Sequence, residues 1–491
     1  MFRDHDFDLP RNLPSNEQAL TQDLELNTLF NAMALGDKFL FQIAKDAVLS
    51  GSSDMNTMLY RQDILKDCMK NPSIIREIYD ISIESHEEKK KNWYGLFSRY
   101  PAGILYGSAE MLQMLVGLLK KLRKIAVEHA DNFESEGFST FFAMIKDELD
   151  DEYFSVIQNH LKALKFRDGV LISAELDEGN VGVDYILRRP HDRSRSWVQR
   201  IFTRKSPVYT FRIADRDDSG ARALSELRDR GINLVANVLA QSSDHIENFF
   251  KMLGVELAFY VGCLNLYDQL AHIGGTVSFP LPVAAGERKH AFEGLFDVCL
   301  ALTMGQKVVG NDVNADDKDC VIITGANQGG KSTFLRSIGL AQLMMQCGMF
   351  ITAGSFSSNI CEGLFTHYKR EEDAFMESGK LDEELSRMSQ VVDNVGPNSL
   401  LLLNESFSAT NEREGSEIAK QITCALLESR VKVFFVTHLY EFAHVLYDEK
   451  MENALFLRAE RQADGERTFK VVKGEPLETS YGEDLYRAIW G

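Results

Sequence analysis

A glycine-rich segment in the last third of the chain has the residue types and spacing of a phosphate-binding loop. The segment Gly325-Ala-Asn-Gln-Gly-Gly-Lys-Ser332 matches G-x-x-x-x-G-K-[ST] at every position. The glycines let the backbone curl so that successive N–H groups point at a phosphate, and a following helix N-terminus adds partial positive charge. In this chemistry Lys331 binds the β- and γ-phosphates and the Ser332 hydroxyl coordinates Mg²⁺. We therefore expect ATP and Mg²⁺ as ligands. The predicted nucleotide-binding residues are Gly325, Ala326, Asn327, Gln328, Gly329, Gly330, Lys331, Ser332 and Thr333.

Two apolar runs further along end in polar residues that suit ATP hydrolysis. Four leucines precede Asn404 and Glu405, and the apolar run 433–436 is followed by Thr437 and His438. Glu405 is predicted to polarise the attacking water, and His438 to contact the γ-phosphate. Asn404 is predicted to share the magnesium with Ser332, although it lacks the charge of the usual Asp, so turnover is expected to be slow. The predicted catalytic residues are Glu405, His438 and Lys331.

The elements around these residues predict an α/β domain. Residues 321–324 are β-branched and apolar, as in a strand, and residues 333–349 have the pattern of a helix. After the Phe-Pro-Leu-Pro segment at 279–282, short apolar runs alternate with helices, which is typical of a mostly parallel sheet. Buried parallel strands place their ligands at their carboxyl ends. We place this P-loop ATPase domain at residues 285–491.

The upstream part is predicted to be mostly α-helical with a small β-containing insert. Apolar residues at spacings of three and four predict helices over 26–44, 60–83, 109–129, 221–239 and 247–270. A hairpin is predicted from strands near 169–176 and 181–187. The predicted domains are a helical region at 1–140, the insert at 141–215, returning helices at 216–284 and the ATPase domain at 285–491.

A basic segment follows the hairpin directly. Residues 188–205 contain seven basic residues against one acid, with Trp197 and Phe202 between them. Such a loop suits contacts to the DNA backbone, and the alternative is a solvated loop without a partner. The predicted DNA-binding residues are Arg188, Arg189, Arg193, Arg195, Arg200, Arg204 and Lys205.

Composition limits the classes of function. The 491 residues carry 73 acids and 54 bases, a formal charge of −19, which excludes a uniformly basic nucleic-acid coat protein but not a local DNA-binding patch. No apolar run approaches the roughly 20 residues of a membrane span, and residues 1–10 lack a signal-peptide pattern. The seven cysteines form no C-x-x-C pair, which favours a reducing cytoplasm.

Several segments resemble the DNA mismatch repair MutS family. Thr324-Gly-Ala-Asn-Gln-Gly-Gly-Lys-Ser-Thr-Phe-Leu-Arg336 is similar to its phosphate loop, and Val309-Gly-Asn-Asp-Val313 resembles the segment before that loop. Asn404-Glu-Ser-Phe-Ser-Ala-Thr-Asn-Glu-Arg-Glu-Gly415 resembles its Walker B motif and D-loop, and Phe435-Val-Thr-His-Leu-Tyr-Glu-Phe442 its strand-Thr-His segment. Upstream, Tyr60-Arg-Gln-Asp-Ile-Leu resembles the family's core domain, and the long helices around the insert resemble its levers and clamp.

The resemblance implies an ABC-class ATPase domain that works as a homodimer. Each composite site of the family is completed in trans by a serine of the partner, and Ser378 is the matching candidate here. The family places an aromatic residue near position 308 to stack on adenine, whereas this chain has Val308, so adenine selectivity stays open. No segment resembles the family's N-terminal mismatch-recognition domain with its Phe-x-Glu wedge, so a shortened MutS-like ATPase is expected.

The first functional hypothesis is therefore a dimeric ATPase clamp that grips mismatched or branched DNA through the backbone, in a DNA-associated cytoplasmic protein of repair or recombination. The alternative is a nucleotide-gated scaffold that binds a protein partner, hydrolyses ATP slowly and does not bind DNA. An SMC-type or transporter-associated ATPase fits less well, because the chain lacks long heptads and membrane segments.

Overall fold

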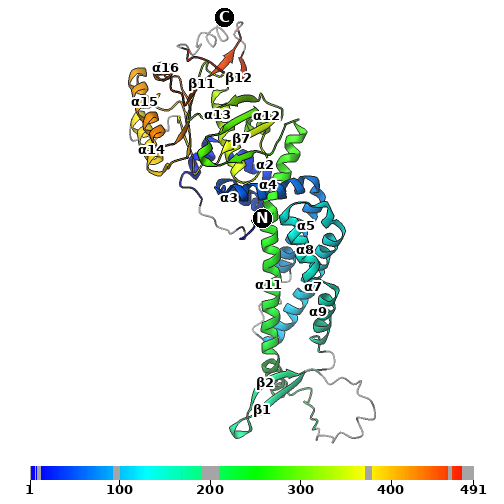
Figure 1. The fold of residues 1–491 in the computed structure, drawn as a ribbon. Helices are drawn as coiled ribbons and strands as arrows, with labels where there is room; N and C mark the ends of the chain where they lie inside the picture. The colour runs from blue at the N-terminus through cyan, green and yellow to red at the C-terminus, as the bar shows by residue number, and fades with distance from the viewer. Residues whose placement is uncertain are drawn as a thin grey trace. The chain divides into compact units, whose positions relative to one another are not determined.

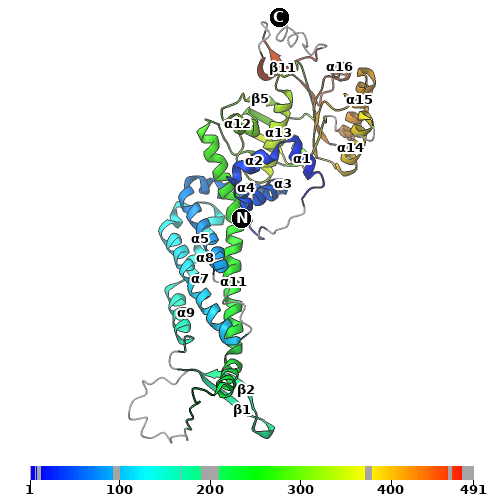
Figure 2. The same cartoon turned by 180° about the vertical axis from the view of Figure 1, so that it is seen from behind.

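The structure is a computed structural model of a mixed α/β protein (Figures 1 and 2). It describes residues 2–5, 7, 13–91, 100–166, 169–188, 209–370, 379–462 and 467–477. The chain divides into two compact units. The first unit comprises Met1–Ile75, Glu134–Phe138 and Val255–Gly491, and the second comprises Arg76–Phe133 and Ser139–Gly254.

The second unit is built from helices and one β-hairpin. Strands β1 (Leu171–Leu176) and β2 (Gly182–Arg188) pair antiparallel around the short helix η2 (Glu178–Asn180), which confirms the predicted hairpin. A small core joins Leu105 of one helix to Ile232 and Ala236 of another. The helices are α5 (Pro72–Lys91, from Arg76 on), α7 (Pro101–His129), η1 (Ala130–Asn132), α8 (Glu136–Glu148, from Ser139 on), α9 (Asp151–Ala163) and, up to Gly254, α11 (Asp218–His272).

Four helix predictions were wrong about where the helices break or continue. The predicted helix 26–44 is broken into α2 (Leu26–Ala34) and α3 (Lys38–Leu49), because Leu35 and Gly36 adopt positive φ angles of 49° and 88°. The predicted helix 60–83 is broken before Pro72 into α4 (Met55–Lys70) and α5, since proline cannot donate the next helical hydrogen bond. The last two predicted helices form the single 55-residue helix α11.

Two helical segments are long and apolar enough, by length and composition, to cross a bilayer. They are Pro101–Asn132 and Asp218–His272. The most apolar window of the second is 83% buried inside the protein and that of the first 50%. The buried core helix of a globular protein passes the same test, so these two segments are weak evidence for membrane spans.

The main sheet of the first unit has six strands in the order β12-β11-β6-β10-β9-β8. All neighbours are parallel except β12, which pairs antiparallel with β11, so the predicted mostly parallel sheet is confirmed. Val436 pairs with both Ile323 and Asn404, so β6, β10 and β9 end at one edge of the sheet. The strands are β6 (Cys320–Thr324), β8 (Leu364–Tyr368), β9 (Leu400–Asn404), β10 (Lys432–Val436), β11 (Ala454–Arg461) and β12 (Arg467–Lys473).

Helices cover both faces of this sheet (Figures 1 and 2). On one face α14 (Lys380–Asn394), α15 (Glu412–Glu428) and α16 (Tyr440–Asp448) pack on alternate strand residues such as Leu401 and Leu403. On the other face lies α13 (Lys331–Gln346), where Gly339 leaves room for Leu402. Because successive strand side chains point to opposite faces, one apolar run supplies both cores.

A second sheet and the N-terminal helices complete this unit. The sheet has the order β3-β7-β4-β5 and consists of β3 (Leu281–Val283), β4 (His290–Leu295), β5 (Asn311–Asn314) and β7 (Ser355–Asn359). Helix α12 (Val298–Met304) packs on α2 and α13, and α1 (Glu17–Asp23) packs on β8. The short helix η3 (Ala285–Glu287) follows β3. Arg336 of α13 binds both Asp297, which caps α12, and Glu25, which precedes α2.

Gly348 ends α13 and provides a test of this packing. It has a φ of +78°, and a Cβ there would lie 2.6 Å from the Cβ of Arg61. We expect Gly348→Ala to lower the free energy of unfolding by about 1–3 kcal/mol, measured by thermal and denaturant unfolding. Gly117→Ala is the control, because Gly117 lies inside α7 and a Cβ there meets no heavy atom within 4 Å beyond the nearby helix backbone, so it should stabilise by about 0.5–1 kcal/mol. Equal effects of the two substitutions would contradict this account.

Candidate functional site

The glycine-rich loop joins β6 to α13 through residues with positive φ angles. Gly325, Gln328 and Gly330 have φ angles of 108°, 57° and 85°. A Cβ at Gly325 would lie 2.9 Å from the backbone nitrogen of Ala459 on β11, so only glycine fits there. Gly330 stands at the N-cap of α13, and the helix begins at Lys331, two residues earlier than predicted. The strand, loop and helix thus follow one another in the order that anion binding at a helix N-terminus requires.

Lys331 lies within this loop and is almost fully buried. Its Nζ donates to the carbonyl oxygens of Gly325 and Ala326, both at 2.9 Å. Burial lowers the pKa of the Lys331 ammonium to about 8, the Glu405 carboxylate opposes this shift, and the positive Arg467 adds to it. Among the described residues this buried ammonium donates only to neutral carbonyls, so a negatively charged ligand is strongly favoured there.

Two oxygen atoms converge where a magnesium ion is expected. The Ser332 hydroxyl donates to Oδ1 of Asn404 at 3.0 Å. Oxygen ligands of this kind are those that Mg²⁺ prefers, and it usually keeps waters and substrate phosphates as its other ligands. The pair therefore fits Mg²⁺, with Asn404 supplying a neutral oxygen in place of a carboxylate.

Glu405 and His438 form a second polar pair at the same sheet edge. His438 Nε2 lies 2.7 Å from Oε1 of Glu405, and this hydrogen bond is the main reason why the pKa of Glu405 is lowered. An ionised carboxylate only accepts, so Nε2 carries the proton. Glu405 has a φ of +55° and its N–H donates to Val436 O at 2.8 Å, so the adjacent strand β10 holds it in a strained conformation.

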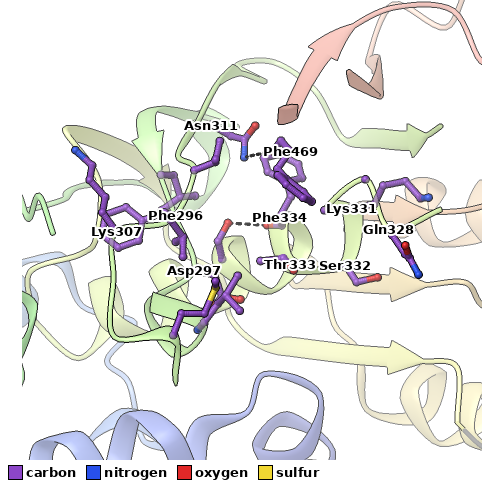
Figure 3. A pocket seen from close by; sticks show the side chains of 18 of the residues that line it. Phe296, Asp297, Lys307, Asn311, Gln328, Lys331, Ser332, Thr333, Phe334 and Phe469 are labelled. Carbon is purple, nitrogen blue, oxygen red and sulfur yellow. Dashed lines mark hydrogen bonds between the residues drawn. The ribbon is translucent and has the colours of Figure 1, made fainter. Parts of the chain in front are cut away.

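A cavity of about 500 Å³ extends from the loop toward α12 and the second sheet. Its volume is within the roughly 300–1,000 Å³ that is typical of small-molecule sites. Figure 3 shows Lys331, Gln328 and Ser332 at one end, Phe296 and Lys307 at the other, and Phe469 between them. Val308 lines the same cavity, as do Glu405 and Thr333.

Sequence reasoning missed the aromatic residues of this cavity. Phe469 lies on β12 with a φ of +58°, and Asn311 holds its strand by accepting from Val471 N at 2.8 Å and donating to Phe469 O at 3.4 Å. Phe296 immediately precedes Asp297, the N-cap of α12. Polar and apolar residues alternate over 468–471, which indicates a strand. Nothing local indicates that this edge strand lies beside the glycine-rich loop.

Comparison with known proteins agrees with these features. A sequence-family model described as the MutS2 N-terminal domain matches residues 53–273, and one described as MutS domain V matches residues 321–488. The chain belongs to the MutS family. The domain V match includes residues 321–324 of β6 as well as Lys331, Glu405 and His438. The polar residues that the structure brings together at the sheet edge therefore all lie in a MutS-type domain.

Relatives within the MutS family match about half of the chain. Human MutS protein homolog 4 is 26% identical over 286 residues, 56% of this chain and 30% of its own length. The DNA mismatch repair protein MutS of Fusobacterium nucleatum is 25% identical over 281 residues, again 56% of this chain and 30% of its own. The DNA mismatch repair protein MutS of a Thermotoga species is 30% identical over 224 residues, 45% and 28% respectively. The chain thus spans less than a third of these relatives.

Several predicted residues of this MutS-family chain lie outside the described residues. They are Ser378 and the basic residues Arg189, Arg193, Arg195, Arg200, Arg204 and Lys205. Arg188 is described: it ends β2, is exposed, and its Nε donates to the hydroxyl of Ser173 at 2.9 Å. The predictions for the other basic residues and for Ser378 stay predictions.

Proposed function

We propose that this protein is an ATP-hydrolysing, DNA-binding member of the MutS family that works as a homodimer with Mg²⁺. The observation that carries the proposal is the convergence of three strand ends. Lys331 follows β6, the Asn404–Glu405 pair ends β9, and His438 follows β10. These groups serve the three tasks that hydrolysis of a phosphate anhydride needs: phosphate binding, charge neutralisation and water activation.

In the proposed reaction each side chain has a separate task. Lys331 exchanges its two loop carbonyls for phosphate oxygens. Glu405, held ionised by His438, accepts a proton from the attacking water. His438 fixes the direction of that carboxylate through its 2.7 Å hydrogen bond. A magnesium ion bound by Ser332 and Asn404 would neutralise charge on the phosphates.

The aromatic lining of the cavity supports stacking of a nucleotide base. Phe296 and Phe469 offer ring surfaces on which a base can stack, beside the apolar Val308. Phe469 thus supplies an aromatic surface in the same cavity as Val308. This composition supports stacking of a base such as adenine without the aromatic residue at position 308.

DNA is proposed to bind through backbone charge and without base readout. The support is the sequence of residues 188–205 and the MutS names of the relatives. Mismatched or branched duplexes are the proposed targets in repair or recombination, because backbone contacts respond to DNA shape. Ser378 of the partner subunit is proposed to complete each ATP site, and the protein is proposed to be cytoplasmic and DNA-associated.

A second candidate is a nucleotide-gated scaffold that binds a protein and not DNA. The neutral Asn404 at the magnesium position favours slow hydrolysis, which suits such a switch. Titration of the protein into labelled homoduplex, single-mispair and four-way-junction DNA at low salt separates the two functions. A complex with any of these supports the clamp, and no complex with all three supports the scaffold.

The pKa of Lys331 predicts proton uptake on ATP binding. In the free protein this pKa is about 8, and bound phosphates raise it. Below pH 7 Lys331 is already protonated, so little uptake follows, whereas about one proton is taken up at pH 9 and ATP affinity falls by up to about tenfold per pH unit. Calorimetric titration in two buffers with different ionisation enthalpies measures this uptake. No uptake at pH 9 would contradict the role of Lys331.

Removal of the Glu405 charge separates binding from hydrolysis. Glu405→Gln keeps the shape but cannot accept the proton, so turnover should fall at least about a hundredfold while ATP affinity stays within about twofold. ATP that is bound but not hydrolysed should also stabilise the dimer, whose molar mass light scattering measures. Glu417→Gln, an exposed change on α15, is the control and should turn over normally. Normal hydrolysis by Glu405→Gln would show that another group is the base.

The basic loop predicts a salt-dependent DNA affinity. Arginine-to-glutamate changes at Arg193, Arg195, Arg200 and Arg204 should weaken DNA binding and reduce the slope of log K against log salt by about 0.9 for each phosphate that the variant no longer neutralises. Lys450→Glu makes one charge reversal of the same kind in the turn after α16 and should leave the slope unchanged. Identical slopes for both variants would contradict DNA binding by this loop.

A further inference from the structure

We propose that Arg467 of β12 is a further phosphate-binding residue, which contacts the nucleotide's polyphosphate from the same chain as the glycine-rich loop. This inference rests on the proposed ATPase function. It adds to the loop lysine a second cation, brought by an antiparallel strand at the edge of the sheet.

The hairpin of β11 and β12 lies directly against the glycine-rich loop. A Cβ at Gly329 would lie 2.8 Å from the Cβ of Ala459 on β11, and one at Gly330 would lie 3.5 Å from Cβ of Phe469 on β12. A side chain at Gly329 would therefore not fit against the hairpin, whereas the distance at Gly330 is that of an ordinary van der Waals contact. This close approach makes Phe469 part of the cavity lining and places Arg467 beside Gln328 of the loop.

Arg467 reaches the loop and keeps donors to spare. Its Nη1 donates to Oε1 of Gln328 at 3.0 Å, and Gln328 lines the cavity. Its Nε is buried and has no hydrogen-bond partner among the described residues. A buried N–H without an acceptor costs free energy, which an incoming acceptor regains. The Arg467 guanidinium thus donates through Nη1 to the neutral amide of Gln328, while its Nε–H has no acceptor among the described residues.

The charges at this end of the cavity favour a ligand with several negative charges. Arg467 lies close enough to Lys331 to lower the pKa of the lysine further, while Glu405 acts in the opposite direction. The two cations therefore repel each other, and the Glu405 carboxylate, which also binds His438, offsets part of this repulsion. A polyphosphate relieves this repulsion. Because a guanidinium binds phosphate oxygens more strongly than a neutral amide oxygen, phosphate is expected to replace Gln328 as its acceptor.

The test is competition of ATP and AMP against a fluorescent ATP analogue. Arg467→Ala should weaken ATP binding about tenfold and AMP binding less than about twofold, because AMP lacks the outer phosphates. Arg467→Lys keeps the charge but not the paired donors, so its ATP affinity should lie between those of the unchanged protein and Arg467→Ala. Lys470→Ala is the matched control: it removes a cation from the same strand that pairs instead with Asp312 at 3.5 Å. Equal ATP affinities of Arg467→Ala and Lys470→Ala would overturn the inference.

A second variant separates a direct contact from support of the loop. Gln328→Ala removes the side chain that Arg467 holds but keeps the loop's backbone. If Gln328→Ala reproduces the whole ATP loss of Arg467→Ala, then Arg467 only positions the loop and the inference is wrong. Lys331→Ala reports on the proposed function itself. Full ATP binding by Lys331→Ala would refute that function, whereas loss with Lys331→Ala and none with Arg467→Ala would refute this inference alone.

Discussion

The register of three parallel strands is the constraint on which the site depends. Val436 of β10 is paired with Ile323 of β6 on one side and with Asn404 of β9 on the other. A shift of one residue would turn each strand over and move the polar side chains away from one another. Because the register holds, Lys331, Glu405 and His438 meet although the first and last are 107 positions apart in the sequence. The cores on both sheet faces, which bury Leu402 and Leu403 in opposite directions, maintain that register.

The antiparallel hairpin adds a second wall to this edge. Ala459 lies so close to Gly325 and Gly329 that the loop can curl only with glycine at both positions. The same hairpin brings Phe469 and Arg467 beside the loop, the first into the cavity and the second onto Gln328. The surroundings of the glycine-rich loop therefore combine two parts. One is the parallel core of the sheet, and the other is the edge strand β12, which contributes Phe469 and Arg467.

Much of the site could be predicted because its signals are local. The spacing from Gly325 to Ser332 and the polar ends of two leucine- and valine-rich runs indicate a nucleotide site, and the structure brings these residues together. Phe469 and Arg467 were not predicted, because the sequence of an edge strand does not indicate which strand it pairs with or in which direction it runs. Helix ends were misjudged at two places: Leu35 and Gly36 break a periodic apolar pattern, and α11 continues through Ser242 and Ser243, although serine disfavours helix interiors.

The most direct test of the account is steady-state ATP turnover of the purified protein, alone and with homoduplex, single-mispair and four-way-junction DNA. The account predicts measurable turnover that at least one of these DNAs raises or lowers, with the largest effect from the DNA shape that the clamp prefers. Turnover that is identical under all four conditions would contradict coupling between the ATP site and DNA.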